Sequence, residues 1–361
     1  MSHLTPQQFQ DTIQAAVVQR SIKYTSVHPL AIRWQADDTS ASVDTTRFQA
    51  LLSIFQFPTA QELIIQEDDR TPGWTVQSKF RDTLTAAIAN RQGRALVIVH
   101  YAGHGLVDAD GVFHLAEKIT GNRKLDFRLF LLSWALPTQY IMEGVDNVDV
   151  LFILDCCFAH TVTRAPVVAP RIVEIIAATE DNTPRAYSPP ANTFTSKLLS
   201  EISLRLRNGH KYVEFAEIIE TLRSRAQARV KPCHALKMGM ASICLPFTGV
   251  CPVDPTTIKP KVRAVFGVNI DQDISPEDLR RLTDWIRTVP ENVSLSLEGV
   301  YSADSTYLIL TAAYSVFSKL AGVGGYTLIK EVRGPNMRAS VPPATPSGQE
   351  NVPFSKRPRT K

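Results

Sequence analysis

The chain has 361 residues, of which 44% are hydrophobic and 20% are charged, and its formal net charge is +4. These are ordinary globular values and exclude a mainly disordered or fibrous chain. So modest a charge, part of which comes from the C-terminal end, does not indicate a nucleic-acid-binding protein. The longest apolar runs are far shorter than the ~20 residues of a membrane-spanning helix. The N-terminus lacks the basic start and apolar core of a secretory signal, so we expect a reducing, cytoplasmic location and no membrane contact.

Five cysteines are present, an odd number without the spacing of a disulfide framework, which indicates at least one free thiol. Four metal-binding side chains fall close together in the sequence, but they lack the C-x2-C knuckle typical of zinc sites. We interpret these cysteines as buried or incidental thiols. The four side chains are those of Cys233, His234, Cys244 and Cys251.

The first half of the chain alternates helical and strand patterns. A helix capped by Thr5, with Pro6 at its first position, is expected as an accessory element. After it the pattern alternates regularly, and the run from Ala95 to Tyr101 is apolar on both faces, as in the centre of a covered sheet. Alternation of this kind predicts a mainly parallel α/β sheet flanked by helices. The expected helices are 5–19, 44–55 and 77–91, and the expected strands are 27–34, 62–66 and 95–101.

The second half of this sheet is less regular. Residues 106–147 are mixed, and we assign no element boundaries there. A second buried strand follows at 148–154, and a further strand at 171–178. Thr193 or Thr195 is a suitable cap for the helix at about 195–207. Met240 to Leu245 is the candidate to close the sheet. The expected strands are 148–154 and 171–178, and the expected helices are about 195–207 and 212–228.

Four prolines between Pro246 and Pro260 mark a linker. The patterns of residues 261–333 run β-α-β-β-α-β, which predicts a small α+β domain of ferredoxin-like order. Its first helix opens with a capping box at Ser275. Residues 334–361 are rich in Pro, Ser and Asn and should be disordered. Their basic end is either a solvated charge run or a nuclear-import signal. The expected units are 1–21, 22–245, 246–260, 261–333 and 334–361.

Two expected strands end in reactive residues. Gly103-His104-Gly105 comes just after the strand that ends near Tyr101, and Asp155-Cys156-Cys157 follows the strand that ends at Leu154. Ligands of an open parallel sheet bind outside the carboxyl ends of its strands, so both groups should share one rim. A nearby imidazole favours the thiolate that acts as a nucleophile. A satisfied loop histidine beside buried cysteines is the alternative interpretation.

These motifs resemble the catalytic His and Cys motifs of the caspase/metacaspase family of cysteine peptidases, whose His lies about 50 residues before the Cys. Asp155-Cys156-Cys157 is similar to the D-S-C or D-C-C form of metacaspases and fungal caspase-like proteins. The resemblance covers roughly residues 22–245 and implies a caspase-like fold. By it, Cys157 is the nucleophile and His104 the general base of a cysteine endopeptidase. Alternation along the strand agrees, because it points Cys156 toward packing.

The resemblance also implies the other parts of the site. The oxyanion would be held by the backbone N–H groups of Gly105 and Cys157. Asp155 matches the metacaspase pocket acid, and Asp181 and Glu180 lie where a second one is expected, so an Arg or Lys before the cut is expected. Capping of a turn is the alternative role for Asp155.

No cofactor is needed for this chemistry. Many metacaspases require calcium, but the sequence lacks an EF-hand loop, and the acids Asp108 and Asp110 are too few to predict a site. The expected partners are protein or peptide substrates, with a further protein bound by the C-terminal domain. The main alternative function is a catalytically silent caspase-like interaction module, and another is a scaffold without chemistry.

Overall fold

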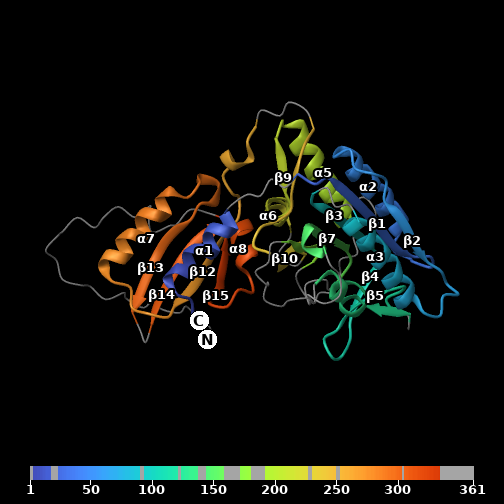
Figure 1. The fold of residues 1–361 in the computed structure, drawn as a ribbon, viewed down its shortest axis with the longest axis horizontal. Coiled ribbons are helices and arrows are strands. Elements are labelled where there is room, and N and C mark those ends of the chain that lie inside the picture. Colours follow the sequence, from blue (N-terminus) through green and yellow to red (C-terminus); the bar gives the residue numbers. More distant parts are fainter. Residues whose placement is uncertain are drawn as a thin grey trace, which may run out of the picture.

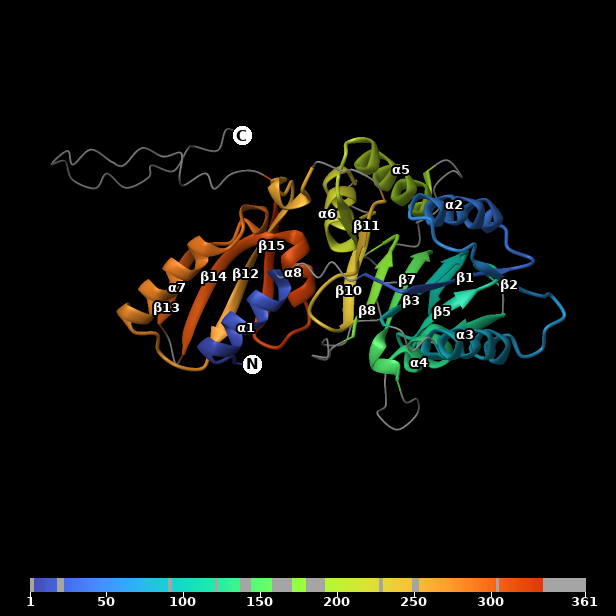
Figure 2. The ribbon, with the colours of Figure 1, turned by 45° about the horizontal axis from the view of Figure 1, so that its top comes forward.

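A computed structural model describes residues 3–17, 23–89, 93–120, 123–136, 144–157, 171–179, 192–226, 230–248, 253–302 and 305–333. Most of its strands form a larger, mainly parallel sheet and a smaller antiparallel one, which lie side by side (Figures 1 and 2), and the others form two short sheets. The predicted mixed α/β class with a helix-flanked parallel sheet is confirmed. None of the described helices has the length and hydropathy needed to cross a bilayer.

The larger sheet has six strands in the order β10-β8-β7-β3-β1-β2. Strands β8, β7, β3, β1 and β2 are parallel, and β10 joins the edge in the antiparallel sense. Every residue of β3 is buried, as expected for a strand covered on both faces. The strands are β1 Ser26–Trp34, β2 Gln61–Ile65, β3 Ala95–Ala102, β7 Val148–Asp155, β8 Val173–Ala177 and β10 Cys233–Met238.

Helices cover both faces of this sheet. Alternate residues of β3 enter two different cores, with Leu96 and Ile98 on one face and Val97 and Val99 on the other, because successive strand side chains point to opposite sides. The first core is shared with α2 Ala41–Ile54, α5 Phe194–Arg207 and α6 Phe215–Arg225. The second is shared with α3 Pro72–Ala89 and the π-helix η1 Arg128–Leu132.

The region that the sequence left without boundaries forms a small antiparallel sheet in the order β4-β5-β6. It projects from the end of β3, because β4 begins at His104. Its members are β4 His104–Val107, β5 Phe113–Ala116 and β6 Lys124–Asp126, and the short helices α4 Ser133–Ala135 and η2 Val145–Asn147 follow η1 in the described chain.

One sheet assignment was wrong. The larger sheet closes with β10, not with Met240–Leu245. Cys244–Pro246 is β11, which pairs instead with β9, Tyr212–Glu214, in a separate two-stranded sheet. The apolar pattern of β10 is interrupted by buried His234 and Lys237, and its edge position was therefore not visible from hydrophobicity.

The smaller sheet has the order β13-β14-β12-β15, and all of its pairs are antiparallel. Its elements follow the expected β-α-β-β-α-β sequence, and the Ser275 side chain caps α7 by accepting the Asp278 N–H. The elements are β12 Arg263–Ile270, α7 Pro276–Thr288, β13 Ser296–Ser302, β14 Thr306–Ala313, α8 Tyr314–Leu320 and β15 Tyr326–Val332; two short 3-10 turns, η5 Pro255–Thr257 and η6 Glu291–Val293, lie beside them.

The N-terminal helix α1, Pro6–Val17, belongs to the core of the smaller sheet. Its Phe9 and Ile13 are buried there, and Leu4 exchanges backbone hydrogen bonds of 2.9 Å with Asn269 and Asp271 beside β12. Figure 1 shows α1 lying against the C-terminal strands, far from β1. The first described residues and the last ones therefore form one folded unit.

The two units meet through α6, β10 and α8. The Ser315 N–H donates to Glu220 at 3.1 Å, and Lys319 forms a buried ion pair with Glu214. Lys231 adds an ion pair to Glu331 at 2.6 Å. Removing one partner of such a buried pair leaves an uncompensated charge, so these contacts fix how the units join.

Candidate functional site

The site lies where β3 and β7 end. These neighbouring parallel strands are paired in register, with Ala102 opposite Asp155. His104 and Cys157 each follow their member of this pair by two residues, so they leave the sheet at the same level. The Gly103 N–H, which points back to the carbonyl oxygen of Asp155 at 3.4 Å, keeps the two chains together beyond the last pair.

Gly105 brings the two motif segments into backbone contact. A Cβ atom at Gly105 would lie 2.1 Å from the carbonyl oxygen of Cys157 and 3.1 Å from its carbonyl carbon. No real side chain tolerates such a separation, so only glycine fits against Cys157. The histidine motif and the cysteine motif therefore touch, as the sequence predicted from the shared rim.

The chain turns out of β3 at Gly103, whose φ of +144° disfavours any other residue. Tyr101 then fixes the turn, because its hydroxyl is 2.9 Å from the carbonyl oxygen of His104 and 3.1 Å from that of Ala116. One side chain of the buried strand thus sets the start of β4 and with it the position of the imidazole.

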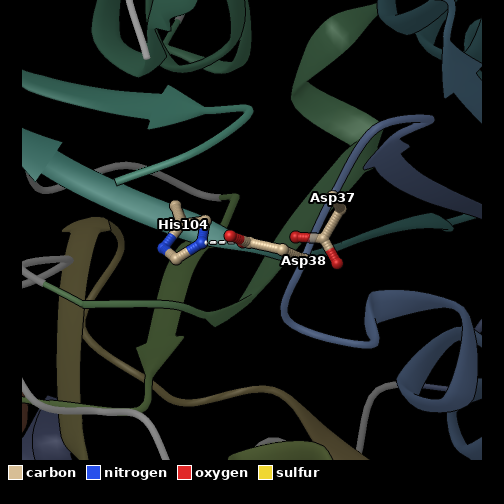
Figure 3. Close-up of side chains that lie close together, drawn as sticks. All are labelled: Asp37, Asp38 and His104. Atoms are coloured by element: carbon tan, nitrogen blue, oxygen red, sulfur yellow. Dashed lines mark hydrogen bonds and ion pairs between the residues drawn. The ribbon is translucent and has the colours of Figure 1, made fainter. Parts of the chain in front are cut away.

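The imidazole of His104 contacts an acid from a third segment. Its Nε2 lies 2.5 Å from Oδ1 of Asp38, in the loop between β1 and α2 (Figure 3). The His104 side chain is 14% exposed and that of Asp38 is 60% exposed. Figure 3 shows that the other ring nitrogen points away from Asp38, which leaves that nitrogen for a different partner.

Neighbouring Asp37 anchors the loop that carries Asp38. Its carboxylate accepts the N–H groups of Thr39 and Ala41, both at 3.0 Å. Asp37, Asp38 and His104 each offer a ligand atom, and these atoms lie within 4.8 Å of one another. Such a group does not identify a metal, and calcium stays a prediction from the family resemblance.

The two adjacent cysteines have different environments. Cys156 is 2% exposed and belongs to the core, and burial raises the pKa of its thiol well above the usual value. Cys157 is half-buried at the rim. Because the thiolate is the nucleophile, the packing favours Cys157 as the reactive thiol. None of the four cysteines in the described part of the chain forms a disulfide.

Asp155 lies at the start of α5. Its carboxylate accepts the N–H groups of Thr195 at 2.7 Å and Phe194 at 3.3 Å. Burial, together with the charge of Asp44, raises the pKa of Asp155 to about 6. The carboxylate therefore accepts hydrogen bonds at the start of a helix, which resembles the capping role considered as the alternative for Asp155. It still lies at the rim. Glu180 and Asp181, the other predicted pocket acids, lie outside the described residues.

Sequence reasoning missed two acids at this rim, Asp38 and Asp44. Asp44 is buried in the first turn of α2 and accepts a hydrogen bond of 2.6 Å from the Thr193 hydroxyl, which also caps α5. Both acids follow β1, the other neighbour of β3. Ligands bind outside the carboxyl ends of parallel strands, so considering the end of β1 as well would have found both acids.

A scan against models of known protein families finds no match, and no curated protein matches the sequence. Function is therefore inferred from the geometry of the rim and from the motifs.

Replacing Gly105 with Ala should disturb the cysteine motif. The added methyl group must displace the Cys157 backbone, so we expect a loss of about 1–3 kcal/mol in the free energy of unfolding and slower alkylation of Cys157 by iodoacetamide. Gly111→Ala is the control for an added methyl group in open space, since no atom lies within 4 Å of its Cβ, and its positive φ of 76° makes the alkylation rate of Cys157, not stability, the quantity to compare. Urea unfolding of wild type and Gly105→Ala and alkylation of all three proteins check this, and equal stability of wild type and Gly105→Ala would contradict the contact.

The raised pKa of Asp155 predicts a pH-dependent stability difference. The folded state holds the proton up to about pH 6, whereas the unfolded chain releases it near the ordinary aspartate pKa of 3.8. The stability advantage of the wild type over Asp155→Asn is therefore full below pH 4 and falls by up to about 3 kcal/mol as the pH rises to 6. Urea unfolding of both proteins from pH 4 to 7 measures this, and a difference that grows with pH would show the opposite shift.

Proposed function

We propose that the chain is a cysteine endopeptidase of the caspase/metacaspase type, with Cys157 as the nucleophile and His104 as the general base. The observation that supports it most is the contact between Gly105 and the Cys157 backbone, which unites the two motifs at one rim. The larger sheet, with its parallel strands and antiparallel edge strand β10, supports a caspase-like fold for this unit.

In this mechanism His104 accepts the proton of the Cys157 thiol, and the thiolate attacks the carbonyl carbon of the scissile peptide bond. The tetrahedral oxygen is held by the N–H groups of Gly105 and Cys157, as the family resemblance implies. His104 then protonates the leaving amine, which leaves an acyl-enzyme on Cys157. Water hydrolyses this thioester and restores the thiol.

A basic residue before the cut is part of the proposal. Asp44 and Asp155 are near enough that the charge of one raises the pKa of the other. Asp44 already pairs with Arg47 at 2.8 Å, so Asp155 is the acid of this pair that we propose receives a substrate guanidinium, which forms paired hydrogen bonds with a carboxylate. Asp155 also accepts two N–H groups of α5, which would hold its carboxylate in place for such a substrate.

An activity-based probe tests the nucleophile. A peptidyl acyloxymethyl ketone with Arg at its reactive end should label the wild type and Cys156→Ala, and labelling should disappear in Cys157→Ala. Cys156→Ala is the matched control, because it removes a thiol one residue away that is buried in the core. Mass spectrometry of the labelled protein identifies the modified residue.

Two other results have clear meanings. Labelling that survives in Cys157→Ala but disappears in Cys156→Ala would reverse the assignment of the nucleophile. A wild type that is folded but neither labelled nor able to cleave peptides would favour the silent caspase-like module instead. The cytoplasmic or nuclear location and the protein partner of the smaller unit stay predictions.

Substrate profiling tests the acidic pair. On a peptide with Arg before the cut, we expect Asp155→Asn to lower kcat/KM about tenfold or more, since it removes a charged hydrogen-bond acceptor. Asp44→Asn should lower it less, because Asp44 already pairs with Arg47. Asp284→Asn, which alters an acid with 68% exposure on α7, should leave kcat/KM unchanged. A peptide library cleaved preferentially after Asp would refute the basic preference.

A further inference from the structure

We propose that Asp38 is a positioning residue that fixes the tautomer and orientation of the His104 imidazole. The inference rests on the proposed peptidase function and adds a third group to the cysteine and histidine. Asp38 does not touch the reacting atoms in this arrangement, but determines which ring nitrogen faces them.

Hydrogen-bond chemistry determines the tautomer. An ionised carboxylate only accepts hydrogen bonds, so the 2.5 Å contact with Asp38 places a proton on Nε2 of His104. In a neutral imidazole the proton on one nitrogen leaves the other as an acceptor. Nδ1, which points away from Asp38 in Figure 3, is then the basic nitrogen available to a thiol proton.

The loop holds Asp38 in place without depending on it. On one side Asp37 accepts the Thr39 and Ala41 N–H groups, and Ala41 begins α2. Asp38 itself is 60% exposed, and an exposed ion pair contributes little to the free energy of unfolding. Loss of the Asp38 carboxylate should therefore change reactivity far more than stability, which separates a positioning role from a structural one.

A second pair of the same kind provides an internal control. On the neighbouring β4–β5 hairpin, Nε2 of His114 lies 2.7 Å from Oδ2 of Asp108. Neither residue is part of the proposed site. Asp108→Asn removes the same charge from a His–Asp contact outside the site, while the Asn carbonyl oxygen can still accept the Asp110 and Val112 N–H groups, which lie 3.1 and 2.8 Å from Oδ1 of Asp108.

The first readout needs no enzymatic activity. In full-length protein labelled with 15N-histidine, long-range proton–nitrogen spectra report the tautomer of each ring, and His104→Gln assigns the relevant signal among the eight histidines. We expect the Nε2–H tautomer for neutral His104 in the wild type. In Asp38→Asn the side-chain amide can donate to Nε2, so a shift toward the Nδ1–H tautomer is expected, while Asp108→Asn leaves His104 unchanged.

The second readout is kinetic. With a peptide carrying Arg before the cut, Asp38→Asn should lower kcat about tenfold to a hundredfold with little change in KM, since the wrong tautomer impairs proton transfer and not binding. Asp38→Glu keeps a carboxylate on a flexible side chain and should restore part of kcat. Asp108→Asn should match the wild type.

The outcomes distinguish this inference from the proposed function. A wild type that shows the Nε2–H tautomer but no peptidase activity would refute the function and leave the His104–Asp38 contact established. An active wild type whose His104 holds the Nδ1–H tautomer, or whose kcat survives Asp38→Asn undiminished, would overturn the positioning role.

Discussion

The register between β3 and β7 is the constraint on which the candidate site depends. Both strands are buried along nearly their whole length, and Ala102 pairs with Asp155 at their carboxyl ends. A slip of one residue would turn every side chain of one strand to the other face, disrupting the packing of both cores and displacing His104 relative to Cys157. The same apolar packing that stabilises the sheet therefore also determines the chemistry at its rim.

The sequence was sufficient for those parts of the fold that local patterns encode. The run of β3 is apolar on both faces, and His104 and Cys157 follow two such runs directly, so their meeting could be predicted. Strand β10 could not be predicted in the same way, because His234 interrupts its apolar pattern. The buried His234 imidazole is hydrogen-bonded to Glu174 on β8, 2.6 Å away, and the local sequence does not show this partner. Asp38 was missed because only the ends of β3 and β7 were considered, although β1 ends at the same rim and Asp38 follows it.

The position of α1 in the core of the smaller sheet depends on contacts between residues distant in sequence. Its apolar face predicts an amphipathic helix, but no pattern within the helix says which sheet it covers. The structure packs it on β12, which follows more than two hundred residues later in the chain. The smaller unit is thus closed by both ends of the described chain, and its contacts with α6 and β10 make it part of the same framework that supports the rim.

Asp155 shows how one side chain connects folding with the proposed function. Its two hydrogen bonds from α5 favour the ionised form, whereas burial and the charge of Asp44 oppose it, and the net effect is a pKa raised to about 6. At neutral pH the carboxylate is still mostly ionised, but its charge is less well stabilised than it would be in water. Arg47 already pairs with Asp44 at 2.8 Å, and a guanidinium bound at Asp155 would offset the desolvation of that carboxylate. Under the proposed function, this unfavourable burial of charge would favour binding of a basic substrate over an acidic one.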